Sequence, residues 1–222
     1  MPAAKNHLFL PGWGARASAY APGLPPDWEA LDPPDFCAAG GSLEAYRRWL
    51  HAEVMARPGR VTLAGHSMGA ALSVLTAASA PEKIENLILI CPAGLPLLKP
   101  MRISAVQFLQ QVVTRRFSAR ESARAVREVL RAPLSALSVA RAVHGLDLTE
   151  DMRRLSMHGV AITVVGCSTD TLVTSLHCRQ AAHLLRASYH ELQVEGGHMW
   201  MFGRWPQFAS ELSPPMVAAA VR

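Results

Sequence analysis

The sequence predicts an α/β fold in which a mostly parallel sheet is flanked by helices. Short apolar runs that read as strands alternate with helical patterns along most of the chain, which is typical of a parallel sheet. The most informative run, 61–64, leads directly into Gly65-His66-Ser67-Met68-Gly69 and then into a small-residue helical segment. In contrast, the patterns of 93–158 are all helical. We therefore expect about six strands, with one helical insertion between two of them.

Two apolar runs near the N-terminus predict the first strands. Residues 7–10 (His-Leu-Phe-Leu) end at the turn-forming 11–14 (Pro-Gly-Trp-Gly), and residues 28–31 end at 32–34 (Asp-Pro-Pro). A helix is predicted over 42–55, where apolar residues recur at near-helical spacing.

The chain then alternates regularly between strand and helix. A strand at 60–64 and a helix at 68–80 flank Ser67, and residues 84–90 form a continuous apolar run, typical of a strand buried on both faces. The later predicted elements are a strand at 160–165, a helix at 175–185, a strand at 189–194 and a mostly helical segment at 206–220.

The inserted segment, 95–158, divides the core domain into 1–94 and 159–222. Its patterns predict helices at 103–117, 118–131, 133–143 and 149–157. The insertion holds eleven Lys or Arg and five Asp or Glu, a balance of +6, whereas the whole chain carries +5. Its local positive field would attract an acidic partner or substrate.

Four arginines share one face of the predicted helix 118–131. They are Arg120, Arg124, Arg127 and Arg131. Both a solvated surface and a docking surface for an anionic partner fit this stripe. Nucleic acid is disfavoured, because no recognition motif accompanies the arginines and no aromatic residues interleave with them.

Length and composition indicate one domain with an insertion. Half of the 222 residues are hydrophobic, enough for a sizeable core. The four cysteines are scattered, which favours buried thiols in a reducing compartment over a zinc site or a disulfide framework. Without a signal-peptide pattern or a membrane-length apolar run, we expect a cytoplasmic protein with no membrane span and no metal.

Ser67 is the candidate nucleophile. A strand, a sharp turn at Gly-x-Ser-x-Gly and a following helix together form the context of a nucleophile elbow. Gly65 and Gly69 leave room where a Cβ would clash. We therefore expect an exposed Ser67 hydroxyl beside the backbone N–H groups of a helix start.

A serine hydroxyl needs a base and an orienting acid to act at neutral pH. In elbow hydrolases these follow in the order Ser, Asp or Glu, His. Glu195-Gly196-Gly197-His198 directly follows the strand at 189–194, which favours His198 as the base. Asp170 lies in the loop after the strand at 160–165 and is the candidate acid. Asp147, Asp151 and Glu195 are weaker candidates for the acid.

A developing oxyanion requires two preorganised N–H donors. One is the backbone N–H of Met68, directly after the nucleophile. The Trp13 N–H, in the loop after the first strand, is the candidate for the other.

These motifs resemble the α/β-hydrolase superfamily over nearly the whole chain. The residues that carry the resemblance are Leu10-Pro11-Gly12-Trp13-Gly14, Gly65-His66-Ser67-Met68-Gly69, Asp170 with Leu172-Val173, and Gly196-Gly197-His198. The resemblance implies that the helical insertion is a cap over the site. Two features depart from the family: Pro11 stands where a histidine is usual, and we expect a trimmed sheet without the customary N-terminal hairpin.

Within the superfamily, the Gly-Trp-Gly loop and the arginine-rich insertion resemble the pimeloyl–acyl carrier protein methyl ester esterases of biotin synthesis. The resemblance implies that cap arginines engage an acidic carrier protein.

We therefore expect a serine carboxylesterase that needs no cofactor and acts on an apolar acyl ester. The candidate pocket residues are Trp13, Met68, Leu95, Phe108, Val112, Leu172, Met199 and Trp200. Thioester, lactone and carbon–carbon bond hydrolysis use the same fold and stay open. A dehalogenase is disfavoured because position 67 is not Asp. A ligand-binding or signalling protein with slow turnover is the alternative from another class.

Overall fold

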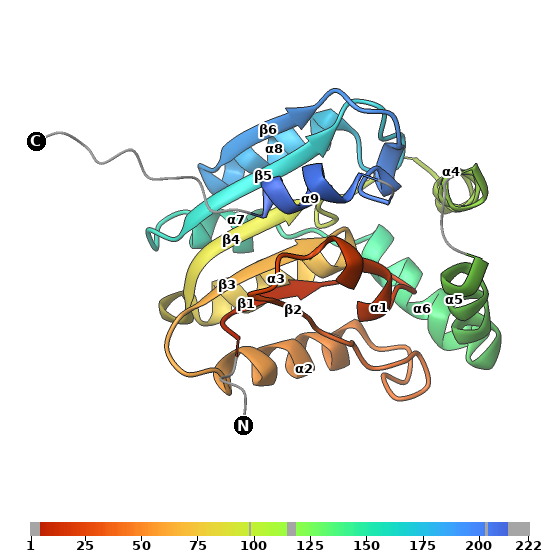
Figure 1. Cartoon of the computed structure of the whole chain (residues 1–222), viewed down its shortest axis with the longest axis horizontal. Coiled ribbons are helices and arrows are strands. Elements are labelled where there is room, and N and C mark those ends of the chain that lie inside the picture. The colour runs from red at the N-terminus through yellow and green to blue at the C-terminus, as the bar shows by residue number, and fades with distance from the viewer. Residues whose placement is uncertain (1–4, 98, 115–118, 203, 213–222) are drawn as a thin grey trace, which may run out of the picture.

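The computed structural model describes residues 5–97, 99–114, 119–202 and 204–212, with side chains except at 112–114 and 119–121. Six strands form one sheet in the order β2-β1-β3-β4-β5-β6, and every pairing in it is parallel (Figure 1). The strands are β1 (His7–Leu10), β2 (Trp28–Ala30), β3 (Val61–His66), β4 (Ile84–Ile90), β5 (Ala161–Cys167) and β6 (Ser188–Leu192). The predicted sheet is confirmed.

Helices connect the strands and form the insertion. They are α1 (Ala17–Tyr20), α2 (Leu43–Met55), α3 (Met68–Ser79), α4 (Met101–Thr114), α5 (Ala119–Arg131), α6 (Pro133–His144), α7 (Thr149–Leu155), α8 (Ser175–Leu185) and α9 (Trp205–Glu211). The predictions of helix at 115–118 and beyond 212 lie outside the described residues. Within the described ranges, no helix is long and apolar enough to cross a membrane.

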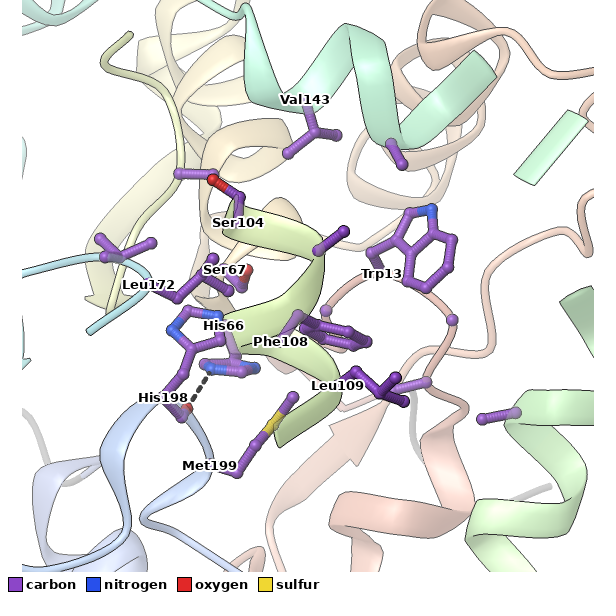
Figure 2. Close-up of a pocket in the computed structure, with 18 of the residues that line it drawn as sticks. Trp13, His66, Ser67, Ser104, Phe108, Leu109, Val143, Leu172, His198 and Met199 are labelled. Atoms are coloured by element: carbon purple, nitrogen blue, oxygen red, sulfur yellow. Dashed lines mark hydrogen bonds between the residues drawn. The ribbon is translucent and has the colours of Figure 1, made fainter. Parts of the chain in front are cut away.

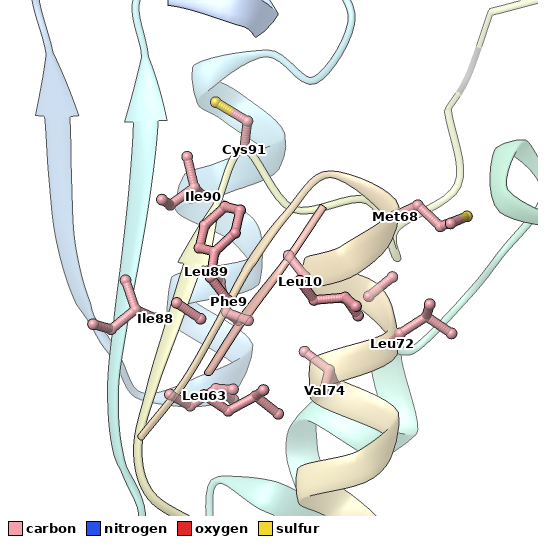
Figure 3. Close-up of a cluster of buried hydrophobic side chains, with 14 of the residues drawn as sticks. Phe9, Leu10, Leu63, Met68, Leu72, Val74, Ile88, Leu89, Ile90 and Cys91 are labelled. Atoms are coloured by element: carbon pink, nitrogen blue, oxygen red, sulfur yellow. The ribbon is translucent and has the colours of Figure 1, made fainter. Parts of the chain in front are cut away.

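A row of helices covers one face of the sheet: α2 packs against α3, α3 against α7, and α7 against α8. On the side of α9, the ring of Phe208 lies 5.4 Å from that of Phe9 in β1. Strand residues such as Leu10 and Leu63 belong to the same buried cluster as Leu72 of α3, part of which is drawn in Figure 3. All six residues of β3 are buried, as expected for a central parallel strand covered on both faces.

Sequence patterns explain the local structure of α2. Its N-cap Ser42 accepts a hydrogen bond from the Ala45 N–H (3.3 Å), which satisfies one of the free donors of the first turn. Tyr46, Leu50 and Val54 recur at four-residue spacing and are buried against the core.

The order of the strands reverses between β1 and β3. From β1 the chain passes to β2 at one edge, whereas β3, β4, β5 and β6 run in sequence toward the other edge. In parallel sheets, such a reversal opens a crevice at the carboxyl ends of the strands, where ligands bind. Helices α4, α5 and α6 lie at this end of the sheet (Figure 1).

The loss of folding stability expected when a leucine is truncated depends on how deeply that leucine is buried. Leu63 in β3 is fully buried, so Leu63→Ala should lower the free energy of unfolding by about 2–5 kcal/mol in urea unfolding. Leu134 in α6 is 81% exposed, and Leu134→Ala should change it by less than about 0.5 kcal/mol. Equal losses for the two variants would contradict the assigned core.

Candidate active site

Ser67 lies at the turn between β3 and α3, with φ 55° and ψ −117°. This left-handed conformation is strained for a residue with a side chain and persists only where its surroundings enforce it. The Ser67 N–H donates to the carbonyl of Ile90 (3.0 Å), and the Ser67 carbonyl accepts from Ala71 and Ala93 (both 3.2 Å). The carboxyl end of β4 and the start of α3 therefore hold the turn from both sides.

Two glycines allow the backbone to approach itself at this turn. A Cβ on Gly65 would lie 2.5 Å from the carbonyl carbon of Gly69, and a Cβ on Gly69 would lie 2.3 Å from the carbonyl oxygen of Leu10. Neither clash can be relieved by a side-chain movement, because the neighbouring atoms are backbone. Glycine at both positions thus brings the end of β1, the turn and α3 together.

Asp170 and His198 form a buried pair. Asp170 follows β5, and its Oδ1 accepts hydrogen bonds from the N–H groups of Leu172 (2.8 Å) and Val173 (3.0 Å). Its Oδ2 lies 2.7 Å from Nδ1 of His198, and both side chains are almost wholly inaccessible to solvent. An ionised Asp170 fixes the proton of His198 on Nδ1, which leaves Nε2 as an acceptor.

His198 Nε2 faces the same cavity as Ser67. The atom is buried and has no hydrogen-bond partner among the described residues. Both residues line this cavity, and Figure 2 shows their side chains next to each other. In the absence of substrate, contacts between a nucleophile and its base are often long, so this arrangement is compatible with proton transfer once a substrate binds.

His66 forms a hydrogen bond with the backbone of the His198 loop. Its Nε2 lies 3.0 Å from the carbonyl oxygen of His198 (Figure 2), and its Nδ1 lies 2.7 Å from the hydroxyl of Tyr20. A carbonyl can only accept, so Nε2 carries the proton and a neutral ring accepts from Tyr20. Burial, together with the nearby His198, lowers the pKa of His66 well below its usual value, and burial raises the pKa of Tyr20.

Tyr20, His66 and Gln111 were not among the residues predicted for the site. Gln111 of α4 accepts a hydrogen bond from the His198 N–H. His66 stands inside the Gly-x-Ser-x-Gly motif, and that position was the available signal. Tyr20 is 46 residues from its partner and Gln111 is 87 residues from its partner, so no sequence spacing links them to the site.

A cavity of about 460 Å³ lies above Ser67, within the size range of small-molecule sites. Most of its lining is apolar, and α4, α5 and α6 contribute to it. The predicted pocket residues that line it are Trp13, Leu95, Phe108, Leu172 and Met199.

Two of the other predicted pocket residues do not line this cavity. The prediction that Trp200 lines the pocket is wrong, because this residue does not line the cavity. Its ring is buried, with its centroid 6.3 Å from that of Phe208, so Trp200 is a core residue. The Met68 side chain is also buried in the core, while its backbone begins α3. The side chain of Val112 lies outside the described part of the chain.

The predicted arginine stripe lies on α5 beside the cavity. Arg124 lines the cavity and donates to the Ser18 hydroxyl (2.7 Å), so it ties α5 to α1. Arg127 and Arg131 are exposed. The side chain of Arg120 is not described.

Within the described ranges, one group of three potential metal ligands is found: Cys91, Asp170 and His198, whose ligand atoms all lie within 4.8 Å of one another. Asp170 and His198 already bond to each other. A hydrogen bond with Cys178 and burial raise the pKa of the Cys91 thiol well above its usual value, which disfavours the thiolate that a metal needs. The group fits an acid–base pair better than a metal centre.

Comparison with known proteins decides the family. The model of the alpha/beta hydrolase family matches residues 8–211. The chain belongs to this family. No curated protein matches its sequence.

Solved structures share the hydrolase fold at low sequence identity. An esterase from Exiguobacterium antarcticum superposes with a TM-score of 0.76 and 12% identity, over 96% of this chain and 91% of that chain. A lipase-esterase related protein from Clostridium acetobutylicum has a TM-score of 0.74 and 13% identity, over 95% of each chain. The enol-lactonase from Burkholderia xenovorans has a TM-score of 0.67 and 20% identity, over 94% of this chain and 90% of that chain.

The buried, neutral His66 should make stability fall in acid. Below about pH 6.5 the unfolded chain binds a proton at this residue while the folded chain does not, so the free energy of unfolding decreases as the pH drops, by up to about 1.4 kcal/mol per pH unit. His66→Gln removes the titrating ring and retains a donor for the His198 carbonyl. Urea unfolding between pH 7.5 and 5 should therefore give a shallower slope for this variant.

His158→Gln, which removes an exposed histidine, is the matched control for this measurement. Parallel stability–pH curves for wild type and His66→Gln would show that His66 is not held neutral in the folded state.

Proposed function

We propose that the protein is a serine hydrolase that cleaves carboxylic esters. The observation that carries this proposal is the shared cavity of Ser67 and His198, with Nδ1 of His198 bonded to the buried Asp170. This arrangement matches the roles of nucleophile, base and orienting acid on an elbow between strand and helix.

The reaction would run in two halves. His198 Nε2 takes the Ser67 proton while Oγ attacks the ester carbonyl, and the resulting imidazolium is stabilised by Asp170. The imidazolium then gives its proton to the leaving alcohol, which leaves an acyl-enzyme. Water, deprotonated by the same histidine, hydrolyses the acyl-enzyme to the free acid and restores Ser67.

The oxyanion would be stabilised by the N–H groups of Met68 and Trp13. Met68 is the first residue of α3, where backbone donors lack an intrahelical partner. Trp13 follows Gly12, and a Cβ on Gly12 would lie 3.4 Å from the Ser67 Cβ and 3.1 Å from Nδ1 of His66. The loop after β1 therefore lies against the elbow, which supports Trp13 as the second donor.

The lining of the cavity favours an apolar acyl group. Trp13 contacts Phe108 edge-on, with ring centroids 5.6 Å apart, and its Nε1 donates to the Ala136 carbonyl (3.2 Å). These contacts join the loop after β1 to α4 and α6. We propose that the inserted helices α4, α5 and α6 act as a cap that shapes the acyl pocket. Helix α7 lies within the predicted cap, 95–158, but it packs against α3 and α8 and therefore belongs with the core.

Thioesters and lactones are the alternative substrates, because the same three residues could cleave them. A ligand-binding protein with slow turnover is the alternative from another class, and a measured turnover rate separates it from an enzyme.

Hydrolysis of p-nitrophenyl esters from acetate to decanoate tests the proposal. Ser67→Ala should lower kcat/KM by about a thousandfold or more, because it removes the attacking atom. Ser138→Ala, an exposed serine of α6, is the matched control and should retain wild-type activity. The chain length with the highest kcat/KM would then report how much acyl chain the cavity holds.

A wild type that is inert on every ester, thioester and lactone would contradict the hydrolase proposal. Wild-type turnover that survives in Ser67→Ala would instead contradict the assignment of the nucleophile.

We further propose that the arginines of α5 dock an acidic partner such as an acyl carrier protein. The exposed Arg127 and Arg131 share this helix with Val126 and Leu130, which line the cavity. A carrier bound there would lie next to the site that receives its acyl group.

The affinity for an acidic acyl carrier protein should fall as NaCl is raised, because salt screens the attraction. Arg127→Glu combined with Arg131→Glu should weaken binding about tenfold or more. The control, Arg153→Glu with Arg154→Glu on α7, makes the same change in net charge elsewhere. Equal binding by the two double variants would rule out the proposed docking face.

A further inference from the structure

A single side chain of the inserted segment connects the two loops that carry Asp170 and His198. Oε1 of Gln111 accepts a hydrogen bond from the His198 N–H, and its Nε2 donates to Oγ1 of Thr171 (3.1 Å). Thr171 directly follows Asp170, and Gln111 is only 8% exposed. A buried amide with both ends paired fixes the geometry of the groups around it.

The His198 loop is shaped to receive this amide. Gly197 has φ +57°, and a Cβ there would lie 2.5 Å from Oε1 of Gln111. The Gly197 N–H donates to Oγ1 of Thr169 (3.0 Å), so the loop after β5 holds the other side of the same turn. The positive φ favours glycine at this position, and the missing Cβ leaves room for the Gln111 amide.

The helix that carries Gln111 also lines the acyl cavity. Ser104, Phe108 and Leu109 of α4 are among the lining residues, and Figure 2 shows this helix passing beside Ser67 and His198. A second contact lies nearby: Nζ of Lys99 donates to the Thr171 carbonyl (2.5 Å) and to Oε1 of Gln107 on α4 (2.6 Å). A shift of α4 would therefore also displace the loop of Asp170 and the loop of His198.

We propose that Gln111 is a positioning residue through which α4 holds His198 in the orientation that faces Ser67. This inference rests on the proposed hydrolase function. Gln111 acts on the backbone of His198 and not on the substrate, so its loss should lower kcat and leave KM nearly unchanged. A displacement of about 1 Å at the base can lower the rate about a hundredfold.

Two substitutions distinguish positioning from general stability. Gln111→Met has a similar length but makes neither hydrogen bond. Gln111→Glu can still accept from the His198 N–H and from the Thr171 hydroxyl, and it adds a negative charge beside His198. That charge favours the protonated imidazole, so the acidic limb of the kcat/KM–pH profile should move to higher pH.

The test compares these variants with wild type, Ser67→Ala and the control Gln180→Met, which makes the same change at an exposed glutamine of α8. Gln111→Met should lose between about tenfold and a hundredfold in kcat with little change in KM. Gln111→Glu should recover most of kcat at pH values above the shifted acidic limb, and Gln180→Met should behave as wild type.

Amide hydrogen exchange supplies a readout that does not depend on turnover. The peptide covering 195–201 should exchange faster in Gln111→Met than in wild type, and Gln111→Glu should restore its protection. A variant that folds poorly would also exchange faster in the peptide of β3, 61–66, whereas a local effect would leave that peptide unchanged.

The possible outcomes separate the two proposals. If wild type is active and depends on Ser67, but Gln111→Met keeps its kcat and its exchange rate, the role of Gln111 is overturned and the hydrolase proposal stands. If wild type is inert while Gln111→Met still loosens the peptide, the contact is structural and both the function and the positioning role fail.

Discussion

The close packing of backbone against backbone at the Ser67 turn is the constraint on which the rest of the site depends. Glycines at 65 and 69 let the end of β1, the end of β3 and the start of α3 approach to distances that no side chain would permit. The strain of the left-handed Ser67 is offset by the hydrogen bonds of the turn and by the burial of β3. The hydroxyl is therefore held where the strand order reverses, beside the loop after β1.

Around His198, separate parts of the chain supply one contact each. Asp170 bonds to the imidazole ring of His198, His66 bonds to its carbonyl oxygen, and Gln111 bonds to its N–H. Buried polar groups are costly unless paired, so each contact narrows the positions that the loop can adopt. The ring's remaining nitrogen faces the cavity, which is where a general base requires an available lone pair.

The surroundings of the cavity combine two opposite environments. Its walls are mostly apolar and come largely from the inserted helices, while its floor holds Ser67 and His198. Apolar walls suit an acyl chain, and they also exclude water, which strengthens the electrostatic interactions of the reacting groups. Arg127 and Arg131 of α5 are exposed, whereas Arg124 of the same helix lines the cavity.

The sequence by itself determined the architecture and the order of the motifs. Apolar runs of strand length and helical spacing depend on local patterns, so the six strands and the elbow at Ser67 could be located without coordinates. Loop positions after β5 and β6 likewise located Asp170 and His198, which the structure pairs.

Only the tertiary structure decided which distant side chains support the site. His66 and Gln111 bond to the His198 loop, and Tyr20 bonds to His66, through folding of segments that are remote in sequence. The tertiary structure also places Trp200 in the core and not in the predicted pocket, because the short helical turn after Gly196 directs the Trp200 ring toward Phe208. Side-chain direction in a loop depends on such backbone turns and on the packing around them, and neither is encoded in a local pattern.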